Sequence, residues 1–183
     1  GNLQLEDPPP TVEGAILARL DSLPPEQQLC LKVAAVVGPS FTLRAVRDAL
    51  PLNDEKARVA LHLAALSEQG LTWLEAVHPE SVYRFRHAIT REVTYGLMTR
   101  SQLLPLHRAV AEWYEHRYRD DIAPHCAIIA HHWENAGESN RAVPYLADAG
   151  EQALRNGMFK EATSLYSSAL DISVQFEEQP SVE

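Results

Sequence analysis

The sequence predicts a mainly α-helical fold that contains one small β-hairpin. Over most of the 183 residues, apolar side chains recur every three or four positions, which is the spacing of one helix face. The period shortens to two only after Gly70, where two short runs flank a turn. Glycine and proline residues end most of the helical runs. We therefore expect helices both before and after a single two-stranded element.

Composition and charge restrict the partners that we expect. Apolar residues make up 45% of the chain, which is enough for a normal globular core. The net charge of −9 and the pI near 5.3 have the wrong sign for a protein that neutralises phosphates along DNA or RNA. No run approaches the about 20 apolar residues of a membrane helix, and the N-terminus has no signal-peptide pattern. We expect neither nucleic acid nor membrane as a partner, and a cytoplasmic location.

The two cysteines and the first ten residues support the same expectation. Cys30 and Cys126 lie far apart in apolar helical stretches and form no C-x-x-C pair, which indicates buried free thiols in a reducing compartment. Residues 1–10 are polar and end in three prolines, the composition of a stiff linker. The first residue is Gly1 and not methionine, so we expect a piece excised from a longer protein.

Four helices are predicted before Gly70. Each has a start and a stop signal: threonine, proline, asparagine or aspartate at the N-terminus, and glycine or proline after the C-terminus. Leu29, Cys30, Val33, Val36 and Val37 are the expected buried stripe of the second helix. The expected bounds are Thr11 (cap) to Asp21, Pro24 or Pro25 to Gly38, residues 43–50 with Thr42 as cap, and Asn53 or Asp54 to Gly70.

A hairpin is predicted after Gly70. Residues 71–74 and 82–86 are the two expected strands, and His78, Pro79 and Glu80 form the turn between them. Helices followed by a two-stranded hairpin are typical of a winged helix, in which the hairpin loop is the wing. We therefore predict a winged-helix domain over residues 11–98.

Residues 99–183 are predicted to be entirely helical. After a break at residues 99–101, one helix runs to about Tyr118 with Pro105 inside it or at its start, and a second runs from Pro124 to Gly137. Ser139 is the expected cap of a third, which runs to about Gly157, and the last runs from Phe159 to about Phe176. Helix starts near Pro124 and Phe159 are about 34 to 35 residues apart, which is the tetratricopeptide period. Small residues in the last helix suit close helix packing. We expect the start of a longer tetratricopeptide-like array.

The strongest candidate site is the junction at residues 83–95, where the second strand runs into the next helix. His87 lies at this junction, where the first backbone N–H groups of a helix lack internal partners and attract anions. Arg91 is four residues further on the same helix face, and Arg86 is adjacent. These three residues are candidates for contact with an anionic group. The alternative is that His87 only caps the helix or bonds to a carboxylate of the fold.

Three other possibilities are metal binding, catalysis and DNA binding. His125, Cys126, His131 and His132 would suit a metal-dependent enzyme, but the spacing of seven between His125 and His132 is not that of a zinc site on one helix. We expect no metal. The phosphate loop, the dinucleotide fingerprint, the nucleophile elbow and the H-E-x-x-H zinc motif are absent from the sequence, so we expect no catalytic residues in this chain.

Direct DNA binding by the predicted winged helix was the third alternative. The third core helix of such a domain often contacts the duplex, and here that helix is residues 54–69. Its charges are balanced and give no basic face for phosphates. The charged side chains and the histidine are Lys56, Arg58 and His62 against Asp54, Glu55 and Glu68.

Four blocks of the sequence resemble one region of the STAND signal-transduction ATPases, the winged-helix and tetratricopeptide-like region that follows the ATPase core. The blocks are residues 11–38, 85–88, 106–112 and 131–137, and the similarity extends from Thr11 to about Ser173. Such proteins include large bacterial proteins and soluble adenylyl cyclases with class III cyclase domains, and transcription regulators. In related switches the histidine of a Met-His-Asp motif contacts the phosphates of bound ADP.

This resemblance implies that His87 senses nucleotide, with Arg86 and Arg91 as basic neighbours. Ala88 stands where the motif has aspartate. It also implies ATP or ADP in a preceding ATPase domain of the same chain, with no cofactor in these residues. The expected function is a non-catalytic module that couples nucleotide state to protein partners of the helical repeats or to a cyclase output. The alternative is the DNA-binding part of a transcription regulator.

Overall fold

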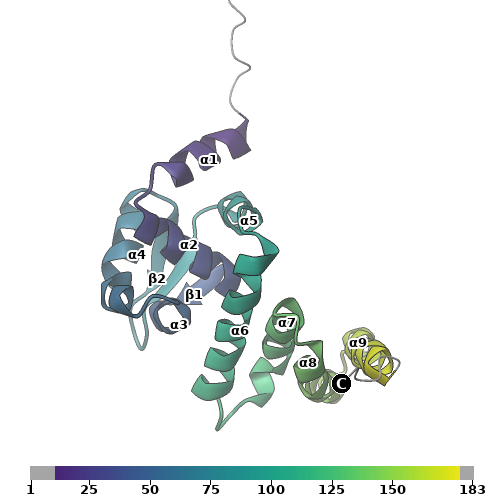
Figure 1. Cartoon of the computed structure of the whole chain (residues 1–183). Helices are drawn as coiled ribbons and strands as arrows, with labels where there is room; N and C mark the ends of the chain where they lie inside the picture. The colour runs from purple at the N-terminus through teal and green to yellow at the C-terminus, as the bar shows by residue number, and fades with distance from the viewer. Residues whose placement is uncertain (1–10, 178–183) are drawn as a thin grey trace, which may run out of the picture. The chain divides into compact units, whose positions relative to one another are not determined.

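The computed structural model describes residues 11–177, which are mainly helical and include a small three-stranded antiparallel sheet (Figure 1). The mainly helical fold class is therefore confirmed. The described residues divide into two compact units, 11–46 with 53–98, and 47–52 with 99–177. The predicted linker over residues 1–10 lies outside the described part of the chain, as do the last six residues.

The first two helices begin as the sequence predicts. Helix α1 (Val12–Asp21) starts after Thr11, whose hydroxyl accepts a hydrogen bond from Gly14 N at 3.1 Å. Helix α2 (Pro25–Val37) places a proline at its first position, where an N–H would have no helical partner. Capping and proline chemistry thus fix these helix starts locally.

Helix α2 is the centre of the first unit, because it packs against α4 (Val59–Glu68), α5 (Ala88–Gly96) and β1 (Ser40–Thr42). The predicted stripe on α2 is buried except for Leu29, which is half-buried. Leu31, Ala34 and Ala35 are also buried, so most of the circumference of α2 lies in the core. A helix that is buried on most sides cannot show the narrow stripe of a surface helix.

The third and fourth helices differ in how well the sequence predicts them. Helix α3 (Leu43–Ala49) is preceded by Thr42, whose hydroxyl accepts from Ala45 N at 3.0 Å, as expected of a cap. The predicted fourth helix is instead a 3₁₀ segment, η1 (Asn53–Arg58), followed by α4. None of the η1 residues is buried, and burial begins only at Val59. Without a buried face, η1 has no packing to favour the α-helical turn.

The sheet contains the predicted hairpin and one strand that the sequence analysis missed. Strands β2 (Thr72–Ala76) and β3 (Val82–Phe85) pair antiparallel, and β1 pairs with the other edge of β3, giving the order β1-β3-β2. Along β3, Tyr83 and Phe85 are buried and Arg84 is exposed, which is the predicted alternation. Phe41 of β1 joins them, with ring centroids 6.1 Å from Tyr83 and 5.5 Å from Phe85.

The second unit is a series of helices. Helix α6 (Arg100–Arg117) starts with a capping box, in which Gln102 accepts from Thr99 N at 3.0 Å. Pro105 lies inside this helix. The predicted helix from Pro124 is split into a 3₁₀ turn, η2 (Ala123–His125), and α7 (Cys126–Asn135). Helices α8 (Ser139–Arg155) and α9 (Phe159–Glu177) follow, and Ser139 is the first helical residue and not the cap, which corrects our prediction.

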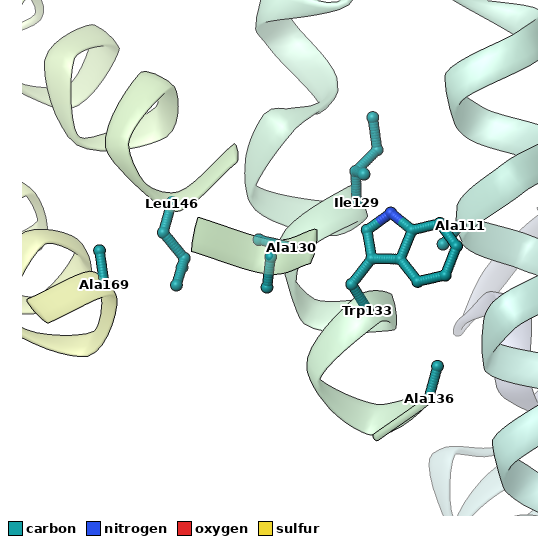
Figure 2. Packing of buried hydrophobic residues seen from close by; sticks show 8 residues of the cluster. Ala111, Ile129, Ala130, Trp133, Ala136, Leu146 and Ala169 are labelled. Carbon is teal, nitrogen blue, oxygen red and sulfur yellow. The ribbon is translucent and has the colours of Figure 1, made fainter. Parts of the chain in front are cut away.

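Small residues let the helices of the second unit approach closely. Figure 2 shows Trp133 of α7 with its ring beside Ala111 of α6, and Ala130 facing Leu146 of α8. Gly150 of α8 lies against Tyr166 of α9, and a Cβ at Gly150 would come 3.0 Å from the tyrosine ring. Gly150 lies in α8, whereas the small residues that the sequence analysis singled out lie in the last helix. Two of these, Ala162 and Ala169 of α9, are buried.

Candidate functional site

The strand β3 runs into helix α5 as the sequence predicts, with His87 as the residue before the helix. The backbone of His87 is extended (φ −136°, ψ 137°), which is the usual conformation of an N-cap residue. Its imidazole is exposed and makes no capping hydrogen bond. The first turn of α5 contains no acidic residue. Thr90 N donates to the His87 carbonyl at 3.1 Å, and the side chain of His87 caps none of the N–H groups at this helix start. The positive end of the helix dipole at such a start attracts anions.

The backbone N–H groups of the two residues before His87 are hydrogen-bonded to other parts of the first unit. Phe85 N donates to Pro39 O at 3.1 Å, and Arg86 N donates to Leu71 O at 3.0 Å. The Arg86 side chain is exposed, and its Cδ lies 4.0 Å from where a Cβ on Gly70 would be. Gly70 has a φ of +68°, a conformation that glycine adopts at little cost.

Arg91 is half-buried and contacts the protein itself. Its Nε donates to Ala35 O at 3.0 Å, near the C-terminal end of α2, and its guanidinium carbon lies 6.0 Å from the Tyr95 ring centroid. Burial raises the pKa of Tyr95, and the positive charge of Arg91 opposes this rise. Sequence spacing placed Arg91 beside His87 but gave no sign of the contact with α2.

One small cavity of the first unit lies near the C-terminal end of α5 and does not include His87. It has a volume of about 120 Å³ and is lined by residues that include Lys32, Thr94 and Leu97. Small-molecule sites usually need about 300 Å³ or more. This cavity is therefore small for a ligand site, and His87 itself is exposed at the surface of the unit.

Four histidines of the second unit contact other rings, whereas His116 is exposed. Nδ1 of His107 in α6 lies 2.9 Å from Nδ1 of His132 in α7, and both rings are buried. His131 meets both rings at an angle, and His125 stacks on Tyr118 at 3.6 Å. His125, His131 and His132 were among the candidate residues in the sequence, whereas His107 was not, although it is adjacent to Leu106 on the buried face of α6.

Metal binding gains no support from this histidine cluster. Over residues 11–177, no group of three or more His, Cys, Asp or Glu side chains is arranged to hold a metal ion. Burial lowers the pKa of His125, while the carboxylate of Asp121 acts in the opposite direction and Arg117 adds to the lowering. These contacts assign the cluster to helix packing.

Glu115 of α6 is a polar centre that the sequence analysis did not identify. Its carboxylate accepts from Trp133 Nε1 at 2.8 Å and from the Tyr145 hydroxyl at 2.9 Å, and Arg141 Nη2 lies 3.2 Å away. Arg141 also covers the Trp133 ring, with its guanidinium carbon 3.4 Å from the centroid. Burial, and then the hydrogen bond to Glu115, raise the pKa of Tyr145 to about 12. Glu115 therefore joins α6, α7 and α8.

Both cysteines are buried free thiols, as predicted. Burial raises the pKa of Cys30 to about 12, and burial followed by the charge of Asp148 raises the pKa of Cys126. A thiol becomes nucleophilic only as the thiolate. Neither cysteine is therefore suited to nucleophilic catalysis at neutral pH.

Glu55 of η1 is paired with two basic side chains. It lies 3.7 Å from Arg58 and 2.9 Å from Nε2 of His62. Leu61 of α4 is 71% exposed. The segment thus presents an exposed apolar residue and charges of both signs, which is not the basic face that contact with the DNA backbone requires.

The comparisons with known proteins identify one distant relative. The chain is 28% identical over 171 residues to an uncharacterized protein of Rhizobium meliloti (strain 1021), and the match covers 93% of this chain. It covers 16% of the relative, so the chain spans a small part of that protein's length. No protein-family model matches the chain, and no solved structure matches it. Within residues 11–177, no helix combines the length and the apolar character that crossing a membrane requires.

Proposed function

We propose that this chain is a non-catalytic regulatory module of a STAND-type signal-transduction ATPase. It couples the nucleotide state of a preceding ATPase domain to protein partners or to a cyclase output. The observation that carries the proposal is the exposed His87 at the start of α5, with both preceding backbone N–H groups anchored. An exposed side chain on anchored backbone can contact a ligand held by another domain and report its presence.

The order of elements supports a winged helix in the first unit. Helix α2 is followed by β1, α3, α4 and then the β2–β3 hairpin, and β1 lies beside β3. The loop of that hairpin, residues 77–81, would be the wing. Val77 is 68% exposed and apolar, which suits contact with protein more than contact with phosphate.

Two turns of the second unit join consecutive helices with the same geometry, which suits the helix series of a tetratricopeptide-like repeat, and the turn at Gly70 in the first unit shares this geometry. Gly137 and Gly157 have φ values of +76° and +74°. Each turn has the two hydrogen bonds of a Schellman motif. These are Gly137 N to Glu134 O (3.0 Å) and Glu138 N to Trp133 O (3.0 Å), and Gly157 N to Leu154 O (3.0 Å) and Met158 N to Ala153 O (2.9 Å).

The alanine after each turn repeats as well. Ala142 and Ala162 lie five residues beyond Gly137 and Gly157, and both are buried. Helix α8 packs against α7 on one side and α9 on the other, and the three follow one another in Figure 1. Repeated helix pairs of this kind present extended surfaces to protein partners.

The relative is compatible with a module inside a larger protein, because this chain corresponds to 16% of it. In the proposed mechanism, His87 contacts the nucleotide phosphates in one state of the ATPase and does not contact them in the other. Such a difference in contacts is what shifts a two-state equilibrium. The repeats then present their surface to a partner in one of the two states.

The test is the nucleotide that co-purifies with the longer natural protein that contains this chain. We expect bound ADP in the wild type and less ADP in His87→Ala. His116→Ala is the matched control, because His116 is an exposed histidine in the last turn of α6. Equal ADP in wild type and His87→Ala would refute the sensor role. No nucleotide in folded protein, even after ATP or ADP is added, would refute the coupling to an ATPase.

The second candidate function is direct DNA binding by the winged helix, which the element order alone favours. Binding of a DNA duplex that weakens steeply with salt would support it, because phosphate contacts release counterions. The paired charges of η1 and α4 and the net charge of −9 argue against such binding. We therefore expect no duplex binding by this chain at moderate salt.

A further inference from the structure

The end of helix α2 leaves one carbonyl in need of a donor. The carbonyl of Ala35 would normally accept from the N–H four residues later, but that residue is Pro39, which has no N–H. Ala35 is 0% exposed, so water is not a substitute. A buried carbonyl without a partner is destabilising, and another group has to supply the hydrogen bond.

Arg91 of α5 supplies it, with its Nε 3.0 Å from Ala35 O. The contact joins residues 56 positions apart in the sequence. A cation at the C-terminal end of a helix is also favoured by the helix dipole. The pair is therefore a charge-assisted hydrogen bond between the middle of α5 and the end of α2.

Apart from Arg91, α5 buries little apolar surface against the rest of the first unit. Its fully buried residues are Thr90 and Thr94, and the Thr94 hydroxyl is bonded to Thr90 O at 2.6 Å within the helix. Ile89 and Val93 are only half-buried. Because apolar burial usually dominates the docking of a helix, the Arg91 contact provides an unusually large share of the attachment of α5.

We propose that Arg91 is a positioning residue for His87. It does not bind the anion; it ties α5 to the end of α2 and so fixes the helix start where His87 lies. Phe85 N and Arg86 N anchor the strand side, and Arg91 anchors the helix side. What His87 contacts rests on the proposed function, whereas the anchoring itself does not.

The anchoring is tested first in the 183-residue chain without ligand, by amide hydrogen exchange. We expect Arg91→Gln to speed exchange of the α5 amides roughly 10- to 100-fold, because a charged hydrogen bond and a buried carbonyl's partner are lost. Arg91→Lys keeps a donor and should restore part of the protection. Arg44→Gln is the matched control, since Arg44 makes a half-exposed ion pair with Glu80 at 3.6 Å.

Two results of that experiment would overturn the inference. One is α5 exchange in Arg91→Gln that matches the Arg44→Gln control. The other is equal acceleration of α2, α4 and α5, which would mean that Arg91 stabilises the whole unit and positions no particular segment. The amides of α7 and α8 serve as internal reference for the exchange conditions.

The positioning role is tested next by ADP retention in the longer protein, measured in a double-mutant cycle. If Arg91 acts through His87, Arg91→Gln should speed ADP loss in the wild type but add little in the His87→Ala background. Arg91→Lys should restore much of the retention. An equal effect of Arg91→Gln in both backgrounds would identify Arg91 as a direct ligand and refute the positioning role. If His87→Ala alone changes nothing, nucleotide sensing is refuted, and α5 exchange by itself decides the anchoring.

Discussion

The histidines of the two units show how differently one residue type is used in this molecule. His107 and His132 are each 1% exposed and contact one another through their Nδ1 atoms. His87 is exposed, and its ring makes no capping bond although its backbone is anchored on both sides. The histidines with ring contacts therefore serve packing here. His87 differs from other exposed histidines, such as His116, because it lies at a helix start, and this makes it the better functional candidate.

The largest expected loss of stability comes from a substitution in the packed core of the second unit. Trp133 is 0% exposed, whereas Trp73 on β2 is 41% exposed. Trp133→Ala should lower the free energy of unfolding by about 3–5 kcal/mol, because it leaves a cavity between helices. Trp73→Ala is the matched control and should lower the free energy of unfolding by much less. Chemical denaturation with hydrogen exchange on α6 to α8 measures both. Similar losses in the two variants would show that the Trp133 contacts are not central to the second unit.

The next effect concerns the polar centre of the same region. Glu115→Ala removes the acceptor for Trp133 Nε1 and the Tyr145 hydroxyl and leaves Arg141 without its carboxylate. We expect a loss of about 2–3 kcal/mol, since unpaired, partly buried donors are costly. Glu112→Ala, an exposed glutamate on the same helix, should change stability by less than about 0.5 kcal/mol. A small effect of Glu115→Ala would mean that water replaces the carboxylate.

The local signals in the sequence predicted most of the elements but few of the contacts that matter for the site. Thr11, Thr42 and Gly70 marked helix ends because caps and positive φ values depend on neighbouring residues only. Strand β1 has three residues and exists through its pairing with β3, about 40 positions away, so no periodicity could reveal it. The Arg91 contact likewise depends on Pro39 at the end of another helix.

For the candidate site too, the sequence predicted the local elements but not the contacts between distant residues. The junction of strand and helix at His87 followed from the change of period, and the exposure of the ring did not. His107 was missed because its partner His132 lies on another helix. Contacts between elements that are distant in sequence leave no local pattern, and these contacts separate packed histidines from exposed ones.

A smaller effect is expected at high pH in the first unit. Burial raises the pKa of the Cys30 thiol from 9.0 to about 12. Because the thiolate is favoured in the unfolded state, stability is full below pH 9 and falls as pH rises toward 12. At pH 10 the share of Cys30 in the loss should be about 1 kcal/mol, and Cys126 and partly buried tyrosines such as Tyr145, whose pKa values are also raised, add to it. Denaturation at pH 8, 9 and 10 measures the total, and Cys30→Ala should show a smaller loss than the wild type. An equal slope in Cys30→Ala would assign the effect to other groups.

The smallest effect compares two helix starts. Thr99 accepts and donates in a capping box at the start of α6, whereas the side chain of His87 caps nothing at the start of α5. Thr99→Ala should therefore cost about 1 kcal/mol, and His87→Ala less than about 0.5 kcal/mol. His87→Asp should even stabilise α5 by about 0.5–1 kcal/mol, because aspartate is a better cap in the same extended backbone. Chemical denaturation of the three variants tests this order.

The variant His87→Asp also distinguishes an effect on stability from an effect on the proposed function. A carboxylate at position 87 would repel the phosphates that we expect there, so His87→Asp should raise stability and shorten ADP retention in the longer protein. Thr99→Ala should do the reverse, with lower stability and unchanged ADP. If His87→Asp destabilises the chain as much as Thr99→Ala does, then His87 makes a structural contribution of its own. Higher stability together with shorter ADP retention in His87→Asp is the trade-off expected if His87 belongs to a functional site.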